Sequence, residues 1–308
     1  MEEVNLGLTA SWIAATVRSS SPLMLVLLGE TLTQRVGIVN LGVEGQMLVG
    51  ACFGFGVAAH MHDPVIGLCV GALAGLVLSL LHGVLCIHLR VNQIASGLCV
   101  MMLGMGITSY IGRAFVGGEV SGLPSLAEVS ASNTFWHPIL TQLTWSAPIA
   151  LVLPVLAGLF LFRTRNGLHW RTVGESSQVA LALGIRPRLV QWQGLLVGGV
   201  LSGFAGAVLS IDYTQTWAQD MTKGIGLIAV GLVIVARWNP FLVLPIALLF
   251  GIADTSVLRL QAAAINTSSY LLQAAPYVFC LLVLIVTRLR ATHDNQMPAG
   301  LKAVFSDQ

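Results

Sequence analysis

The polar segment most able to support chemistry is 29–45, which lies between two apolar stretches of the chain. It contains Glu30, Arg35, Asn40 and Glu44 together with several glycines. Asn40 and Glu44 are four residues apart, so they share one face if the segment is helical. A carboxylate here must face protein or a water-filled cavity, because contact with lipid is too costly. The segment is predicted either to break the membrane helices and line a solute route, or to form a wet turn with Glu30 and Arg35 in solvent.

A second polar segment opens a later apolar stretch and carries only amide and hydroxyl side chains. These are Asn92, Gln93 and Ser96. Such neutral groups can bind an uncharged polar solute without a large desolvation penalty. They can instead cap a helix or form hydrogen bonds between helices. We predict that Asn40, Glu44 and these three residues form a transport pathway, with structural roles as the alternative.

A third segment, 174–185, lies inside a long basic connection between apolar stretches. Ser176 or Ser177 can serve as the N-cap of a helix, and Gly184 suits its C-terminal end. The Ala/Leu run between them favours a helix. A short amphipathic helix in such a loop either rests on the membrane surface or docks a soluble partner.

The sequence lacks the motifs of enzymes and metal sites. His82 and His88 are six residues apart, so they lie on different faces of a helix, and no cysteine has a metal-ligand spacing. We find no nucleophile elbow, HExxH, phosphate loop or paired carboxylates. The chain is therefore predicted to have no catalytic residue, no metal site and no cofactor. Any ATP would be hydrolysed by another chain, and no nucleic-acid partner is expected.

The composition shows which elements must position these segments. Of 308 residues, 56% are hydrophobic and 9% are charged, and the mean hydropathy is +0.84. Soluble domains carry about 25% charged residues, so lipid rather than water must surround most of this chain. We predict an all-α, polytopic transmembrane helical bundle with about nine spans, within a range of 8–10. The predicted spans are 12–30, 37–59, 64–87, 93–112, 146–162, 190–211, 222–236, 241–258 and 270–287.

The distribution of Lys and Arg predicts the orientation of these spans. The connection 163–188 holds five arginines against the single acid Glu175, and the chain after 287 begins with Arg288 and Arg290. We predict that 163–188 and the tail 291–308 are cytoplasmic and that the long, poorly basic loop 113–145 is external. The transmembrane domain would then be 1–290, with an external N-terminus.

Two tight turns hint at an internal repeat. Both contain a proline, one at His62-Asp63-Pro64 and the other at Trp238-Asn239-Pro240. By the predicted orientation the two hairpins turn on opposite sides of the membrane. That arrangement predicts an inverted repeat with broken or short helices, such as 222–236, around a site near the bilayer midplane.

These motifs, taken in order, resemble one family. The run Gly29-Glu30-Thr31 to Arg35, followed by Asn40-Leu41-Gly42-Val43-Glu44-Gly45, is similar to the signature of ABC-importer permeases of the ribose/nucleoside/branched-chain amino acid superfamily. The nucleoside ("simple sugar") branch is the most similar. Further matching segments are 92–98, 180–185, 221–240 and 249–254. The resemblance covers roughly residues 20 to 290, whereas 118–145 departs from the family pattern.

The resemblance implies a set of partners. They are a second, homologous permease, a cytoplasmic ATPase and an extracytoplasmic substrate-binding protein, with the chain itself in membrane lipid. The segment 174–185 would be the coupling helix that enters a groove on the ATPase. The coupling residues implied are Glu175, Ser177, Ala180, Ala182, Leu183 and Gly184.

The resulting hypothesis is a multi-pass permease of the bacterial cytoplasmic membrane that imports a nucleoside or related nucleobase compound by alternating access. A sugar or branched-chain amino acid permease is the alternative within the class. An ion-coupled secondary transporter would need coupling-ion ligands near the midplane, for which only Glu44 is a candidate. An intramembrane enzyme using Glu44 or the histidines lacks a convergent set of catalytic residues.

Overall fold

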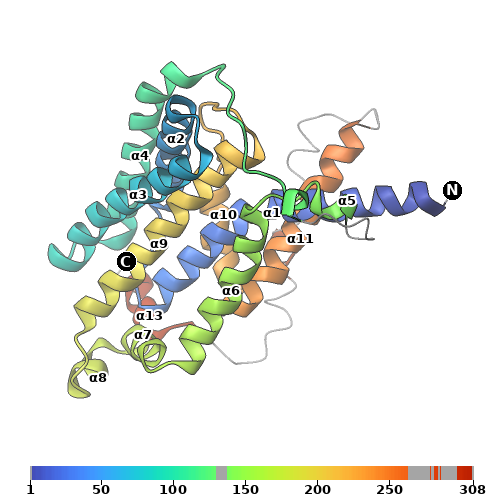
Figure 1. The fold of residues 1–308 in the computed structure, drawn as a ribbon. Helices are drawn as coiled ribbons and strands as arrows, with labels where there is room; N and C mark the ends of the chain where they lie inside the picture. The colour runs from blue at the N-terminus through green and yellow to red at the C-terminus, as the bar shows by residue number, and fades with distance from the viewer. Residues whose placement is uncertain are drawn as a thin grey trace.

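A computed structural model describes residues 2–129, 137–262, 278, 281–283, 285 and 297–306. Within these ranges the chain is almost entirely helical, and its β-structure is limited to two isolated bridges. The helices form a bundle with α1 at its centre (Figure 1). This confirms the predicted all-α, polytopic fold.

The helices are of three kinds. The long ones are α1 (Glu2–Arg35), α2 (Val43–Met61), α3 (Pro64–Gly83), α4 (Gln93–Ile111), α6 (Ser146–Arg163), α9 (Pro187–Ala207) and α11 (Pro240–Ala262). The shorter ones are α5 (His137–Leu140), α7 (Arg165–Glu175), α8 (Ser177–Ala182), α10 (Ile225–Val235) and α13 (Ala299–Ser306). The π-helical turns η1 (Val84–His88) and η4 (Val208–Tyr213) extend α3 and α9, and the 3₁₀ turns are η2 (Gly112–Phe115) and η3 (Leu126–Val129).

Six described helices are long and apolar enough to cross a membrane. They correspond to the predicted spans that begin at 12, 64, 93, 146, 190 and 241. The predicted span 37–59 begins later, because residues 36–42 form a turn and the helix starts at Val43. The predicted span 222–236 is the 11-residue helix α10, about 16 Å long. The predicted span 270–287 lies outside the described residues.

Helix α1 continues without a break through three polar residues, Ser19–Ser21, that interrupt its apolar sequence. Three consecutive serines donate hydroxyl hydrogen bonds to carbonyls three or four residues earlier, for example from Ser20 to Thr16 at 2.8 Å and from Ser21 to Val17 at 2.7 Å. Their polar groups are therefore satisfied inside the helix. Directly after them, the side chains of Leu23–Leu28 are at most 2% exposed. The centre of α1 thus forms the middle of the core, with α9 and α11 packed against it.

Glycines allow α2, α3 and α9 to approach each other closely. A Cβ atom added at Gly203 of α9 would lie 2.8 Å from the Cα of Gly75 of α3. A Cβ atom added at Gly71 of α3 would lie 2.7 Å from the carbonyl oxygen of Gly50 of α2. Small residues at such crossings let backbones pack in direct contact, which stabilises membrane helix pairs. These three helices are therefore held together by backbone packing.

We predict that Gly203→Ala destabilises the protein by about 1–3 kcal/mol, because an extra methyl group overpacks a close crossing. The expected result is a lower melting temperature in detergent and less folded protein in the membrane. Gly106→Ala in α4 is the matched control, because a Cβ atom there meets nothing within 4 Å. A Gly203→Ala variant as stable as Gly106→Ala would contradict this account of the packing.

The two proline turns have the same local structure. In each of His62-Asp63-Pro64 and Trp238-Asn239-Pro240, the first residue has a positive φ, 55° and 53° respectively, and the proline begins the next helix. In each, the central carboxylate or amide oxygen accepts a hydrogen bond from a backbone N–H two residues later. The turn at Asn239 lies beside Arg35 at the C-terminal end of α1. The turn at Asp63 lies at the far end of α2, a helix of 19 residues that starts at Val43.

The region 113–145 is organised by short elements. It contains η2, η3 and α5, and two isolated bridges pair Glu119 with Thr216 and Ser125 with Thr144. Residues 130–136 lie outside the described ranges. This region therefore packs onto the chain that follows η4, and its exposure to the cell exterior remains a prediction.

Candidate functional site

Helices α2 and α10 both begin inside the bundle. Gly45, in the first turn of α2, packs on Met101 of α4, where an added Cβ atom would lie 2.8 Å from the Met101 Cα. Met101 is eight residues beyond the first residue of α4, so the start of α2 lies about 12 Å along that helix. The start of α10 lies beside the same turn of α2, because Gly226 faces the backbone of Glu44. The N-termini of α2 and of the short helix α10 therefore meet within the membrane-spanning part of the chain.

Glu44 joins these two N-termini. Its Oε1 atom accepts hydrogen bonds from the Thr222 hydroxyl at 2.5 Å and from the Gly224 N–H at 2.8 Å. Its Oε2 atom accepts from the Gly226 N–H at 2.6 Å. The residue is 5% exposed, so its charge is compensated by these donors and by the positive ends of both helices. We call Glu44, Thr222, Gly224 and Gly226 the Glu44 junction.

A second buried network holds the 36–42 turn against α1. The Glu30 Oε1 atom accepts from the Gln34 side chain at 2.8 Å and from the Asn40 backbone N–H at 3.2 Å. The Asn40 amide group donates to Gln46 Oε1 at 3.0 Å. Glu30 and Arg35 are 1% and 9% exposed. The alternative of a wet turn with both side chains in solvent is therefore wrong, and the helix break is present.

The same network reaches the C-terminal end of α10. Arg35 donates through Nε to the backbone carbonyl of Trp238 at 2.5 Å. The Trp238 indole N–H in turn donates to Gln34 Oε1 at 2.7 Å. Helix α10 is thus fixed at its N-terminus by Glu44 and just beyond its C-terminus by two side chains of α1. A movement of this short helix would have to break both sets of hydrogen bonds.

The predicted residues of α4 have three different positions. Asn92 is exposed and caps α4, since its side chain accepts from the N–H groups of Ile94 and Ala95. Gln93 accepts from the Val39 N–H at 2.9 Å and so holds the 36–42 turn. Ser96 is buried, and its hydroxyl lies 3.2 Å from His82 Nδ1 of α3.

Of the five predicted pathway residues, Asn40 is part of the 36–42 turn and Gln93 is hydrogen-bonded to it. Ser96 reaches the turn through His82, whose Nε2 atom lies 3.3 Å from the Val39 carbonyl oxygen. Glu44 belongs to the junction with α10. Asn92 lies at the surface. The contribution of these five residues to a solute route remains a prediction.

Helix α8 has the ends that the sequence predicts. The Ser176 hydroxyl accepts from the Val179 N–H at 3.3 Å, and Gly184 follows the helix with a φ of +77°. Ala180 is fully buried, whereas Val179, Leu181 and Leu183 are 53%, 61% and 66% exposed. The helix is therefore anchored by its alanine and presents large apolar side chains outward.

The other predicted coupling residues lie at the edges of α8. Ser177 and Ala182, its first and last residues, are exposed. Glu175, at the end of α7, accepts from the Ala299 N–H of α13 at 3.1 Å. Figure 1 shows α8 at one edge of the bundle, with α7 beside it. The surface of α8 is thus available to another molecule, while Glu175 joins α7 to the C-terminal segment.

Comparison with known proteins assigns the chain to a family. Residues 12–287 match the model for the branched-chain amino acid transport system / permease component family. The chain belongs to this permease family. It is similar to a putative glucose ABC transporter permease protein of Haloferax volcanii, with 35% identity over 84% of this chain and 80% of that protein.

Two further relatives cover still more of the permease. One is a nucleoside ABC transporter permease protein of Lactococcus lactis, 32% identical over 86% of this chain and 88% of that protein. The other is a guanosine ABC transporter permease protein of Bacillus subtilis, 30% identical over 93% and 95%. No solved structure matches the chain. The permease is therefore a multi-pass membrane subunit of the ABC-transporter class, as the resemblance predicts.

The structure of the permease also reveals a buried acid directly after the predicted span 190–211. Asp212, in η4, is 2% exposed. Its Oδ2 atom accepts from the hydroxyls of Thr144, at 2.6 Å, and Ser146. Its backbone carbonyl accepts from Arg18 at 3.0 Å. Asp212 thus joins the ends of α6 and α9 to α1, and its position at the end of an apolar span was the only signal in the sequence.

Proposed function

We propose that this permease is the membrane subunit of an ABC importer that moves a nucleoside or a related nucleobase compound into the cell. In this proposal it works with a second, homologous permease, a cytoplasmic ATPase and an extracytoplasmic binding protein. The exposed apolar surface of α8 carries the proposal, because a permease without an ATP-binding motif needs a docking element for its energy source. The substrate class is supported by the two relatives whose names specify a nucleoside and guanosine.

The orientation belongs to the same proposal. The α13 helix packs against α7, with Ala299 bonded to Glu175 and Leu301 fully buried. The C-terminal segment and the loop 163–188 therefore share one end of the bundle. Because 163–188 holds five arginines and one glutamate, the positive-inside rule supports a cytoplasmic position for both.

The contacts support a route by which ATPase movement would reach the interior. Helix α8 follows α7 directly, and Gly174 of α7 packs on the turn after α1, where an added Cβ atom would lie 3.0 Å from the Arg35 carbonyl carbon. Arg35 in turn bonds the backbone beyond α10. A shift of α8 would thus be transmitted through α7 and Arg35 to α10 and the Glu44 junction. In this mechanism the permease opens alternately to the two sides of the membrane and breaks no covalent bond.

A sugar is the second candidate substrate, and the relative named as a putative glucose permease favours it. Uptake by the complete transporter in proteoliposomes discriminates between the two. We expect ATP-dependent accumulation of labelled guanosine or adenosine, competed by unlabelled nucleosides and unaffected by excess glucose. Glucose accumulation would replace the nucleoside proposal with the sugar one. Uptake by this chain alone, driven by an ion gradient, would overturn both.

A further inference from the structure

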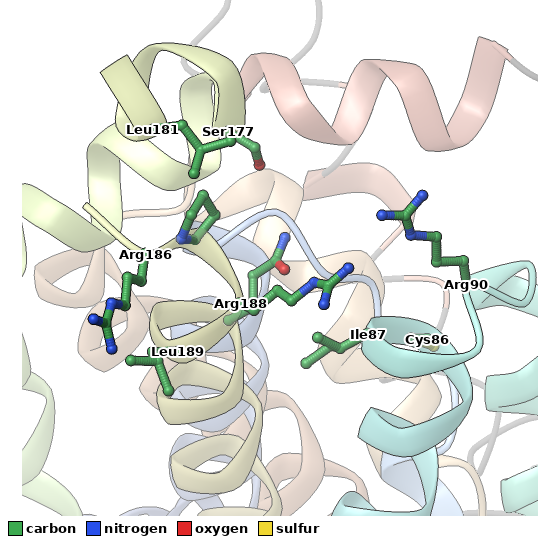
Figure 2. A pocket seen from close by; sticks show the side chains of 10 residues that line it. Cys86, Ile87, Arg90, Ser177, Leu181, Arg186, Arg188 and Leu189 are labelled. Atoms are coloured by element: carbon green, nitrogen blue, oxygen red, sulfur yellow. The ribbon is translucent and has the colours of Figure 1, made fainter. Parts of the chain in front are cut away.

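A basic pocket of about 680 Å³ lies at the end of the bundle that carries α8. It is bounded by α8, the first turn of α9 and the end of η1 (Figure 2). Its lining includes Arg90, Arg186 and Arg188 and no acidic residue. This pocket is separate from the Glu44 junction, and its wall includes Ser177 and Leu181 of α8.

Two of these arginines converge. Figure 2 shows Arg188, from α9, and Arg90, after η1, reaching toward one another across the pocket, while Arg186 points away from both. Among the described residues, none of the three guanidinium groups has a hydrogen-bond or ion-pair partner. Two unpaired cations that face each other repel, and an anion placed between them removes the repulsion. A phosphate suits this position, because guanidinium groups bind its oxygens through charge-assisted hydrogen bonds.

The pocket lies at the depth of lipid headgroups. The two apolar helices that border it span Pro64–His88 and Pro187–Tyr213, 25 and 27 residues, or about 37 and 40 Å. The hydrocarbon core of a bilayer is about 30 Å thick, so the ends of these helices reach the headgroup layer. The His88 and Trp192 rings meet there edge to face, with centroids 6.1 Å apart. Tryptophan is enriched at this level of membrane proteins.

Apolar surface continues from the pocket toward the bilayer. Val84, Leu89 and Leu189, on the two bordering segments, are 43%, 65% and 54% exposed. Leu181 of α8 lines the pocket itself. A ligand with a phosphate and acyl chains would satisfy both parts of this surface, whereas an acidic protein side chain would leave the apolar part uncovered.

We propose that this pocket binds one anionic phospholipid, with its phosphate between Arg90 and Arg188 and its acyl chains along the exposed ends of η1 and α9. The bound lipid contacts Leu181 and so fixes the position of α8 relative to the membrane. The proposal requires a bilayer around the chain but not a particular transported solute.

The test is native mass spectrometry of the purified full chain with added phosphatidylglycerol or phosphatidylcholine. We expect the wild type to retain one more phosphatidylglycerol than the double variant Arg90→Gln/Arg188→Gln, whose affinity should fall by about tenfold or more. Phosphatidylcholine should not compete for that site. Arg165→Gln is the matched control, because it removes an exposed arginine outside the pocket and should leave retention unchanged.

Other outcomes overturn the proposal. Equal phosphatidylglycerol retention by the double variant and Arg165→Gln would mean that charge near the surface attracts lipid without a site. Displacement of the retained lipid by millimolar inorganic phosphate would show a simple anion site. If the double variant keeps its lipid but no longer copurifies with the ATPase, the pocket receives a protein instead. A melting temperature in detergent equal to that of the wild type shows that the double variant is folded.

Discussion

A positive charge on the exposed surface of α8 is expected to abolish ATP-driven uptake while the permease remains folded in the membrane. Ala182 is the residue to change, because it is exposed and lies between Leu181 and Leu183, which are both largely exposed. Ala182→Arg adds a long cation to this apolar surface without touching the buried side of the helix. An unpaired charge buried in a protein interface costs about 2–5 kcal/mol, which lowers the affinity for the ATPase by more than about tenfold.

The measurements are the membrane level of the permease, copurification of the ATPase, and ATP-dependent uptake. Ala180→Arg would be uninformative, because Ala180 is fully buried and the variant would disturb folding. The matched control is Asn166→Arg, which adds the same charge to an exposed position of α7. Normal ATPase association and uptake in Ala182→Arg would refute the coupling role of α8. Loss of both in Asn166→Arg as well would show that added charge alone is harmful.

Helix α8 also shows which features a single sequence can predict. Its limits follow from local rules, because Ser176 supplies the N-cap oxygen and Gly184 adopts a positive φ at the end. The six long spans follow from the same kind of local signal, because a continuous apolar stretch of about 20 residues is stable as a helix across the bilayer. The shortness of α10 likewise follows from the apolar run that ends before Arg237.

The start of α2 could not be predicted in this way. The apolar pattern suggests a span from residue 37, whereas the helix begins at Val43. Residues 36–42 form a turn because Glu30, ten residues earlier, accepts a hydrogen bond from Asn40, and Gln93, more than fifty residues later, accepts one from Val39. These bonds satisfy backbone groups that a helix would otherwise satisfy. A local pattern does not contain such distant partners.

The candidate site likewise combines features that the local sequence predicts with contacts that it does not predict. The polarity of the 29–45 segment identifies Asn40 and Glu44 as unusual, but their partners are elsewhere. Thr222, whose hydroxyl binds Glu44, is 178 residues away in sequence. The position of Asp212 after an apolar span looks the same in the sequence whether the carboxylate is solvated or accepts a hydrogen bond from Thr144. Only the tertiary fold distinguishes these cases.

Neutralising the Glu44 junction is expected to lower both the stability of the permease and its maximal rate of uptake. In Glu44→Gln the amide group has almost the same shape but only one acceptor oxygen. The carboxylate accepts from three donors, namely the hydroxyl of Thr222 and the N–H groups of Gly224 and Gly226. At least one buried donor then faces the amide NH₂ and loses its bond, which costs about 1–3 kcal/mol. The negative charge at two helix N-termini is lost as well, at up to about 2 kcal/mol.

Thr222→Val is the matched control, because it removes one donor and leaves the carboxylate charge in place. Its effect on melting temperature and uptake should be smaller than that of Glu44→Gln. The double variant should be less destabilised than the sum of the two, because both changes remove the same hydrogen bond. If the Glu44 junction serves to hold α2 to α10, Glu44→Gln should lower the maximal rate of uptake and leave the half-saturating solute concentration unchanged. A changed half-saturating concentration with wild-type stability would instead assign Glu44 to solute contact, and wild-type behaviour in both measurements would rule out either role.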